Sequence, residues 1–267
     1  MPLPPETYVD HLRHESALFR TAALAADPAA RVPGCPEWDA TDLLWHLAEV
    51  QWHWAEAVEK RPAKPDETAM PPRPATREDV LAFFDDSQRR LVAALEAAQP
   101  GDEAWNWSSD QTVGFILRRQ AHEALVHRVD AEQTAGAVSP VDPVLAADGV
   151  HEVLDVMLGG MPDWGHWEPL PHVLRVDCTD TGDQFWVRLG VFSGTDPDSG
   201  TTYADEEDLH VVAAPDDAET QPDVVVDGPA AALDLWLWDR GDDAEISVAG
   251  DREVFERFRA IAGTPID

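Results

Sequence analysis

The hydrophobic pattern of this chain changes about halfway along its length, and this change limits the folds that the chain can adopt. In the first half, apolar residues recur with helical spacing in four segments, at about residues 6–26, 39–60, 76–98 and 112–136. Breaks rich in proline and glycine separate these segments, with no strand pattern between them. Four consecutive amphipathic helices predict a helical bundle.

The second half consists mainly of short, β-branched runs, which are typical of strands. A short helix near residues 142–158 precedes them, and two further helical segments follow at 229–240 and 251–261. We therefore expect an α+β protein, with a four-helix bundle and its linking helix over residues 1–165 and a smaller α+β domain over residues 166–267. A chain of 267 residues is long enough for two such cores. The strand-like runs are 172–178, 184–192, 209–214, 223–228 and 245–250.

The charge of the chain argues against several classes of partner. Asp and Glu total 52 against 19 for Lys and Arg, so a formal charge of −33 would repel nucleic acids and anionic membrane surfaces. No segment approaches the roughly 20 apolar residues of a membrane span, and the N-terminus lacks a secretory signal. We expect a cytoplasmic protein that is a monomer or a small homo-oligomer, and we interpret the acidic segments 205–210 and 215–220 as solvated faces or loops.

The two cysteines, Cys35 and Cys178, are too few for a disulfide framework or a cysteine-rich zinc site, which fits a reducing compartment. Cys35 could act as a metal ligand or a redox thiol, although a lone cysteine at a loop–helix junction is more often a small buried residue. Nearly all basic residues are arginines, which suggests a GC-rich genome, with a salt-adapted surface as the competing explanation.

The stretch AHEALVH, residues 121–127, contains two histidines and a glutamate. In a helix, residues four apart lie one above the other, so Glu123 and His127 can point at one ion. His122 lies on a different face, because five positions rotate it by about 140° from His127. The face of Glu123 and His127 also carries Ile116, Gln120, Ala124 and Ala131, so it should look into the bundle, where an unpaired carboxylate is costly.

The second helix places another histidine, His46, on an inward stripe with Leu43, Leu47 and Val50. Three nitrogen and oxygen ligands from facing helices would form a site for zinc or another divalent metal with one open position. The alternatives are that His46 is an ordinary core residue and that Glu123 and His127 form a solvated pair. Asp130 could orient the His127 imidazole or could be a surface carboxylate.

Three segments, residues 32–50, 118–136 and 232–251, give the chain a resemblance to a known family. They read VPGCPEWDATDLLWHLAEV, RRQAHEALVHRVDAEQTAG and ALDLWLWDRGDDAEISVAGD, and together they resemble the maleylpyruvate isomerase family of mycothiol-dependent enzymes, which belongs to the DinB-like metal-binding four-helix bundles. The resemblance covers nearly the whole chain. It implies an N-terminal bundle followed by a C-terminal domain of the isomerase type, distantly like sterol-carrier folds.

The same resemblance implies that His46, Glu123 and His127 hold a divalent metal, with zinc expected first. Other DinB relatives use three histidines, so Glu123 points to the mycothiol-associated branch. The family implies an actinobacterial enzyme that combines mycothiol with a small electrophile, either as an isomerase or as a thiol S-transferase. A metal lowers the pKa of a bound thiol, and the thiolate can add to an activated double bond or displace a leaving group.

Arg240, in the family-like segment WLWDR, is the candidate for contacting an anionic substrate or holding the thiol cosubstrate. Its other interpretation is a surface arginine at a helix end, favoured by the helix dipole. Two other functions remain open from the residues: a non-catalytic small-molecule-binding protein, and a metal-dependent hydrolase that uses bound water.

Overall fold

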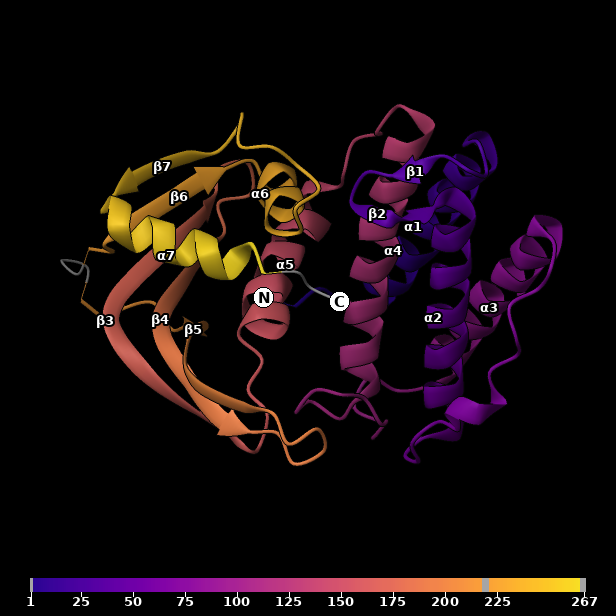
Figure 1. Ribbon diagram of the computed structural model, residues 1–267, viewed down its shortest axis with the longest axis horizontal. Helices are drawn as coiled ribbons and strands as arrows, with labels where there is room; N and C mark the ends of the chain where they lie inside the picture. The colour runs from indigo at the N-terminus through magenta and orange to yellow at the C-terminus, as the bar shows by residue number, and fades with distance from the viewer. Residues whose placement is uncertain (1, 218–220, 265–267) are drawn as a thin grey trace. The chain divides into compact units, whose positions relative to one another are not determined.

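The computed structural model describes residues 2–217 and 221–264, and the contacts between residues divide the chain into two units between Pro140 and Val141 (Figure 1). Helices dominate the first unit and a curved sheet dominates the second, so the structure is α+β, as the change in hydrophobic pattern predicts. The elements of the first unit are α1 (Pro5–Ala25), β1 (Arg31–Val32), β2 (Cys35–Asp39), α2 (Ala40–Lys60), the 3₁₀ turn η1 (Glu67–Ala69), α3 (Arg77–Ala97) and α4 (Val113–Ala135).

Short polar side chains set where the helices of the first unit begin. Asp39 caps α2 by accepting hydrogen bonds from the backbone N–H groups of Thr41 and Asp42, and the Asp42 side chain accepts from the Asp39 backbone in return. Thr112 caps α4 in the same manner through the Phe115 N–H. At the other end of α4, Gly136 has φ 97°, a left-handed conformation that costs little without a Cβ. These caps fix the register of α2 and α4.

The four long helices pack pairwise around a shared apolar core. α1 packs mainly on α4 and α2 mainly on α3, and α2 also contacts α4. Phe19 and Phe84 meet with their ring centroids 5.2 Å apart, and the fully buried side chains of Leu43, Leu44 and Leu47 fill the centre of the same cluster. The predicted bundle is therefore confirmed.

A two-stranded hairpin lies in the break between α1 and α2, where the sequence indicated no strand. β1 and β2 pair antiparallel, with Arg31 opposite Asp39 and Val32 opposite Cys35. The paired segments are too short for a period-two pattern to emerge, and two prolines interrupt the stretch. The hairpin leads directly into the N-cap of α2.

The second unit is built around one mixed sheet, with strands in the order β5-β4-β3-β6-β7. β3 pairs antiparallel with β4 and parallel with β6, and the remaining neighbours are antiparallel. Figure 1 shows α5 and α6 beside the curved sheet, with α7 lying across its strands. The elements are α5 (Pro143–Glu152), the π-helical turn η2 (Val153–Leu158), β3 (Gly165–Cys178), β4 (Gln184–Thr195), β5 (Thr202–Val212), β6 (Val224–Gly228), α6 (Ala230–Leu237), β7 (Ser247–Gly250) and α7 (Arg252–Ala262).

Alternate residues of the central strand β3 face the core of the second unit. Leu174, Val176 and Cys178 are buried, whereas Arg175 and Asp177 between them remain partly exposed and form a two-bonded ion pair. The strand pattern expected at residues 172–178 is therefore present, although β3 starts earlier, at Gly165.

The acidic segment 205–210 belongs to the edge strand β5, so its interpretation as a loop is corrected, while its exposed carboxylates agree with a solvated face. An edge strand rich in charge lacks the apolar alternation that identifies a strand from sequence. The other acidic segment, 215–220, lies partly outside the described residues.

The two units separate after Pro140, whereas the sequence predicted a domain boundary after residue 165. The linking helix α5 causes the difference, because it packs on α6 and thus joins the second unit. Helical character alone suggested that this segment continued the bundle, but its buried residues Leu145 and Val150 contribute to the other core.

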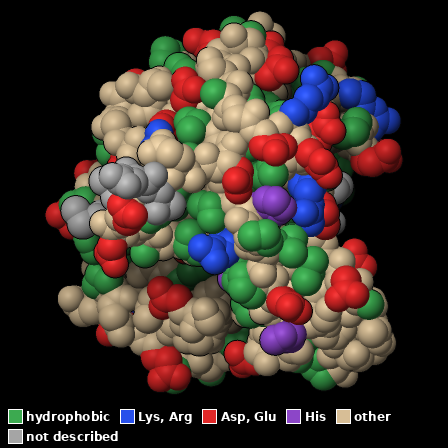
Figure 2. All heavy atoms as spheres, turned by 90° about the vertical axis from the view of Figure 1, so that its left-hand side faces the viewer, with side chains coloured by type: hydrophobic (Ala, Val, Ile, Leu, Met, Phe, Trp, Pro, Cys, Tyr) green, Lys and Arg blue, Asp and Glu red, His purple; other side chains and the backbone are tan. Residues whose placement is uncertain are grey.

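Acidic side chains outnumber basic ones on the visible surface, in keeping with the composition. Figure 2 shows red carboxylates spread over one face, with few blue basic groups among them. Among the described residues, no helix combines the length and apolar character needed to cross a membrane.

A buried ion network joins α4 to α1 and to the segment after α4. The side chain of Arg128 is fully buried, and its Nε donates to Glu15 at 2.8 Å while its Nη1 donates to Glu132 at 2.8 Å. The Ser139 backbone and hydroxyl also donate to Glu132, at 2.9 and 2.7 Å. Both carboxylates depend on Arg128 for charge compensation in a region from which water is largely excluded.

Replacing Arg128→Met should destabilise the first unit by about 3–5 kcal/mol, because Glu15 and Glu132 would remain buried without a cation. Urea unfolding followed by circular dichroism would measure this loss. Arg252→Met is the matched control, since Arg252 pairs with Glu256 on an exposed helix surface and its loss should change stability little. Equal effects of the two substitutions would contradict the importance of the buried network.

The difference in stability between the wild type and Arg128→Met should be smaller in acid than at neutral pH. Burial acts to raise the pKa of Glu132, but hydrogen bonds from Arg128 and Ser139 outweigh it and bring the pKa below the ordinary value of 4.5. A carboxylate with a lowered pKa stabilises the folded state above its unfolded pKa, and that contribution disappears as pH falls through the folded value. The difference between the wild type and Arg128→Met should therefore narrow below about pH 4.5.

Cys178 should resist thiol reagents in the folded protein. Its side chain is buried at the end of β3, and burial together with the nearby carboxylates of Asp183 and Asp180 raises the pKa of the thiol to about 12. Titration with a chromogenic disulfide at pH 8 should report at most one reactive thiol, that of Cys35, and two after unfolding. Rapid native labelling of Cys178, detected by peptide mapping, would contradict this.

Candidate metal centre

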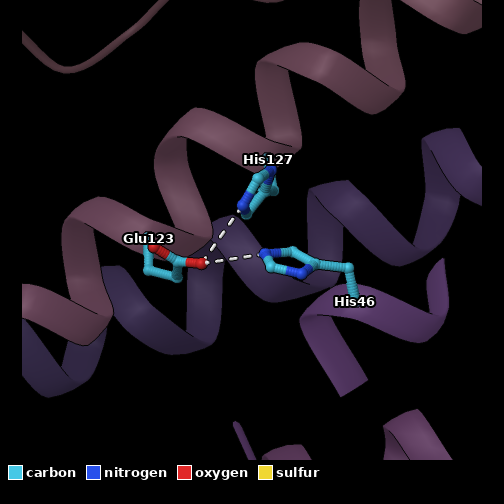
Figure 3. A group of neighbouring side chains, drawn as sticks. All are labelled: His46, Glu123 and His127. Carbon is cyan, nitrogen blue, oxygen red and sulfur yellow. Dashed lines mark hydrogen bonds and ion pairs between the residues drawn. The ribbon is translucent and has the colours of Figure 1, made fainter. Parts of the chain in front are cut away.

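Two helices of the first unit bring His46, Glu123 and His127 together (Figure 3). The Glu123 carboxylate lies between the two imidazoles, with Oε1 3.1 Å from His127 Nε2 and 3.5 Å from His46 Nε2. One ligand atom from each residue falls within 4.8 Å of the others, and no further histidine, cysteine or carboxylate joins this group among the described residues. The structure thus assembles the three side chains that helical spacing singled out.

Helix geometry explains how each side chain reaches this point. Glu123 and His127 are one turn apart on α4, and His46 lies two turns into α2, whose start is fixed by the Asp39 cap. The side chain of His127 is 9% exposed, that of Glu123 18% and that of His46 27%. The group is therefore largely enclosed but open on one side, at His46.

Trp38, the residue before the α2 cap, forms an aromatic wall beside both histidines. Its ring centroid lies 4.6 Å from that of His46 and 6.3 Å from that of His127, and the two imidazoles are 4.8 Å apart. The β1–β2 hairpin supplies Trp38 from β2, which gives this short sheet a role in shaping the site.

Each of the two buried α4 residues has a second partner that fixes its orientation. His127 Nδ1 lies 3.0 Å from Asp130 Oδ2, which leaves Nε2 directed at Glu123. Arg119, one turn before Glu123, donates from Nη2 to the other carboxylate oxygen at 3.0 Å. On α2, the nearest carboxylate to His46 Nδ1 is that of Glu49, at 4.0 Å. Partners of this kind hold metal-binding imidazoles and carboxylates in one orientation.

Opposite charges determine the protonation of this group. Burial acts to lower the pKa of His127, but the carboxylates of Glu123 and Asp130 raise it to about 9. Burial acts to raise the pKa of Glu123, whereas His127, His46 and Arg119 hold it well below its ordinary value. Without a metal, these charges favour an imidazolium that donates to both carboxylates.

The donor set fits a divalent transition metal. Two imidazole nitrogens and one carboxylate oxygen, all on rigid helices and aimed at one point, form the three-ligand set that catalytic zinc sites use. A cation would take the place of the proton that Glu123 and His127 share.

Asp130 is completely buried beside His127, which confirms that it is an orienting carboxylate and excludes the surface interpretation.

The remaining histidines of the first unit lie apart from this group. His122 is buried on another face of α4, where its ring meets Tyr8 edge-on at 6.4 Å, so it is a packing residue as helical rotation predicts. His53 is half-buried among the rings of Trp54 and Trp105. Cys35 is half-buried and packs with Trp38 against the bundle core.

Arg240 lies in the second unit, three residues after the end of α6. Its Nη1 donates to the Trp238 carbonyl at 2.7 Å, and its backbone N–H donates to the Leu235 carbonyl at 2.7 Å. The side chain is half-buried against this turn. Its role with substrate or cosubstrate stays a prediction.

Two residues of the site were missed from the sequence. Arg119 could have been found, because it precedes Glu123 by four positions, the spacing that pairs side chains on a helix. Trp38 left no comparable signal, since its contact with His46 depends on how the hairpin folds back onto α2.

Comparisons with known proteins were made for the sequence and for the fold. Residues 9–132 match the mycothiol maleylpyruvate isomerase N-terminal domain, and residues 144–257 match the C-terminal domain of the same family. Among curated proteins, no sequence match was found.

Two solved structures share the fold. A crystal structure of the mycothiol-dependent maleylpyruvate isomerase has a TM-score of 0.59 at 15% identity, over 92% of this chain and 93% of that one. A histidine-to-alanine mutant of that enzyme has a TM-score of 0.57 at 16% identity, over the same shares of the two chains. Because the two domain matches together span most of the chain in the family's own order, this protein belongs to the mycothiol-dependent maleylpyruvate isomerase family.

Proposed function

We propose that this protein is a metal- and mycothiol-dependent enzyme that acts on a small electrophile, either as an isomerase or as a thiol S-transferase. The observation that carries the proposal is the convergence of His46, Glu123 and His127 on one point of the bundle. Membership of a family named for a mycothiol-dependent isomerase supports the choice of thiol and of reaction class.

The three side chains would hold a divalent metal, with zinc as the first choice for two imidazoles and a carboxylate. A bound metal supplies charge that lowers the pKa of a coordinated thiol, so that the thiolate forms at neutral pH. Asp130 and Arg119 keep His127 and Glu123 in the ligand orientation. Trp38 restricts access from its side and leaves the half-exposed edge of His46 as the approach for ligands.

The chemistry of such a thiolate accounts for both reaction types. Addition of sulfur to an activated cis double bond converts it into a single bond, about which the product can rotate, and elimination of the thiol then leaves the trans alkene. In a transferase, the addition product would instead be released, or the thiolate would displace a leaving group. We propose Arg240 as the cation that contacts an anionic substrate or the thiol cosubstrate.

Further expectations concern the setting of the protein. Use of a low-molecular-weight thiol agrees with a reducing cytoplasm and with an actinobacterial source. The net charge of −33 agrees with small molecules as partners in preference to nucleic acids or anionic membranes. We propose a monomer or small homo-oligomer.

Substitution of the three side chains tests the metal site. Wild-type protein dialysed against zinc should retain about one equivalent, measured by inductively coupled plasma mass spectrometry, and His46→Ala, Glu123→Gln and His127→Ala should each lose most of it. His53→Ala is the matched control, because this histidine also lies on α2 but outside the group, and it should keep the metal. A wild type that retains no metal, or a His127→Ala variant that retains all of it, would contradict the site.

Activity is tested by incubating zinc-loaded protein with mycothiol and a panel of cis-alkene and alkylating electrophiles. Isomerised products or thiol adducts, identified by mass spectrometry, should form only when thiol and metal are both present. Turnover without thiol would instead indicate a hydrolase that uses bound water. Stoichiometric binding without turnover would indicate a small-molecule-binding protein.

A further inference from the structure

The side chain of Gln120 is enclosed on α4, the helix that carries Glu123 and His127. It is 1% exposed, and neither its amide nitrogen nor its amide oxygen makes a hydrogen bond to any residue that the structure describes. Burying an amide with neither of its polar atoms hydrogen-bonded is unfavourable, so such a group calls for an explanation.

Helical geometry places Gln120 on the same face of α4 as the metal-binding group. Gln120 precedes Glu123 by three positions and His127 by seven, which are both spacings of a single helix face. Since helical side chains lean toward the N-terminus, the Glu123 side chain extends back over the turn that carries Gln120. On this face, the neighbours Ile116 and Ala124 are fully buried and apolar, so they offer the amide no side-chain partner.

The bundle contains another buried glutamine that behaves differently. Gln51 on α2 is also fully buried, but its Nε2 donates to the Ser16 hydroxyl on α1 at 3.0 Å. This bond gives Gln51 a clear structural role in joining two helices. Gln120 has no equivalent bond, and it lies on α4, the helix that carries Glu123 and His127.

We propose that Gln120 binds the cosubstrate of the proposed reaction, by hydrogen-bonding an amide group of the thiol that occupies the metal's open position. A primary amide both donates and accepts, so its best complement is a group that does the same, and a secondary amide fits this requirement. Gln120 thus makes the site selective for a thiol that carries an amide near its sulfur. This inference rests on the proposed function, because it requires a thiol at the metal.

Two neutral thiols test the selectivity: N-acetylcysteamine, which carries an amide, and 1-butanethiol, which lacks one. The protein is loaded with Co(II), and binding is followed by the near-ultraviolet absorption that a sulfur ligand produces on this metal. Gln120→Met should bind N-acetylcysteamine about 10-fold more weakly than the wild type does, the effect of one buried hydrogen bond, and should bind 1-butanethiol equally well. Gln120→Leu serves as a second variant, so that the result does not depend on one side-chain shape.

Thermal unfolding of the metal-free protein distinguishes ligand binding from a structural role. If Gln120 had a structural role, its replacement would lower the melting temperature. Removing an amide without a partner should leave stability unchanged or raise it, whereas the control Gln51→Met should lower it by breaking the bond to Ser16. Stability and thiol binding should therefore change separately in Gln120→Met.

Three results would overturn the inference. Equal affinity of wild type and Gln120→Met for N-acetylcysteamine would show that the amide is not used. Equal weakening of both thiols would show a general distortion of the site. The third result concerns the wild type, which is measured before any variant is made. If it binds no Co(II), or binds Co(II) but neither thiol, both the proposed function and this inference are overturned.

Discussion

The enclosure of one carboxylate, that of Glu123, is the constraint on which the candidate metal centre depends. A carboxylate inside a helical bundle is tolerated only when opposite charge surrounds it, because its loss of hydration costs several kcal/mol. Here α4 supplies His127 and Arg119, and α2 supplies His46. His127 is itself held in place by the fully buried Asp130 beside it. The group is a series of alternating charges that extends from α4 to α2.

This arrangement of charges fits a bound cation. The carboxylates of Glu123 and Asp130 raise the pKa of His127, so the site favours a positive charge even without a metal. A divalent ion bound here would replace the His127 proton that faces Glu123, and the hydrogen bonds of Asp130 with His127 and of Arg119 with Glu123 would keep both ligands oriented. Trp38 adds a rigid wall, so the free approach is confined to one side.

Elsewhere on α4, buried polar groups serve different purposes. Arg128 ties α4 to α1 and to Ser139 through two carboxylates, and its bonds are all internal to the first unit. Gln120, eight positions earlier, makes no such bonds, and this contrast within one helix separates a group that stabilises the fold from one that is available to a ligand.

The sequence by itself determined the helices of the bundle and the pairing of Glu123 with His127, because these features depend on spacing within one helix. It also predicted that His46 faces inward, and the resemblance connected it with the α4 pair. Only the tertiary structure decided that His46 and Glu123 meet, that Trp38 stacks on His46, and that α5 packs with the second unit. The strand expected at residues 209–214 overlaps the end of β5, but the charged first part of β5 was missed because it lacks a buried face. The periodicity of a single helix or strand can be read from the sequence, whereas contacts between separate elements depend on how the cores pack.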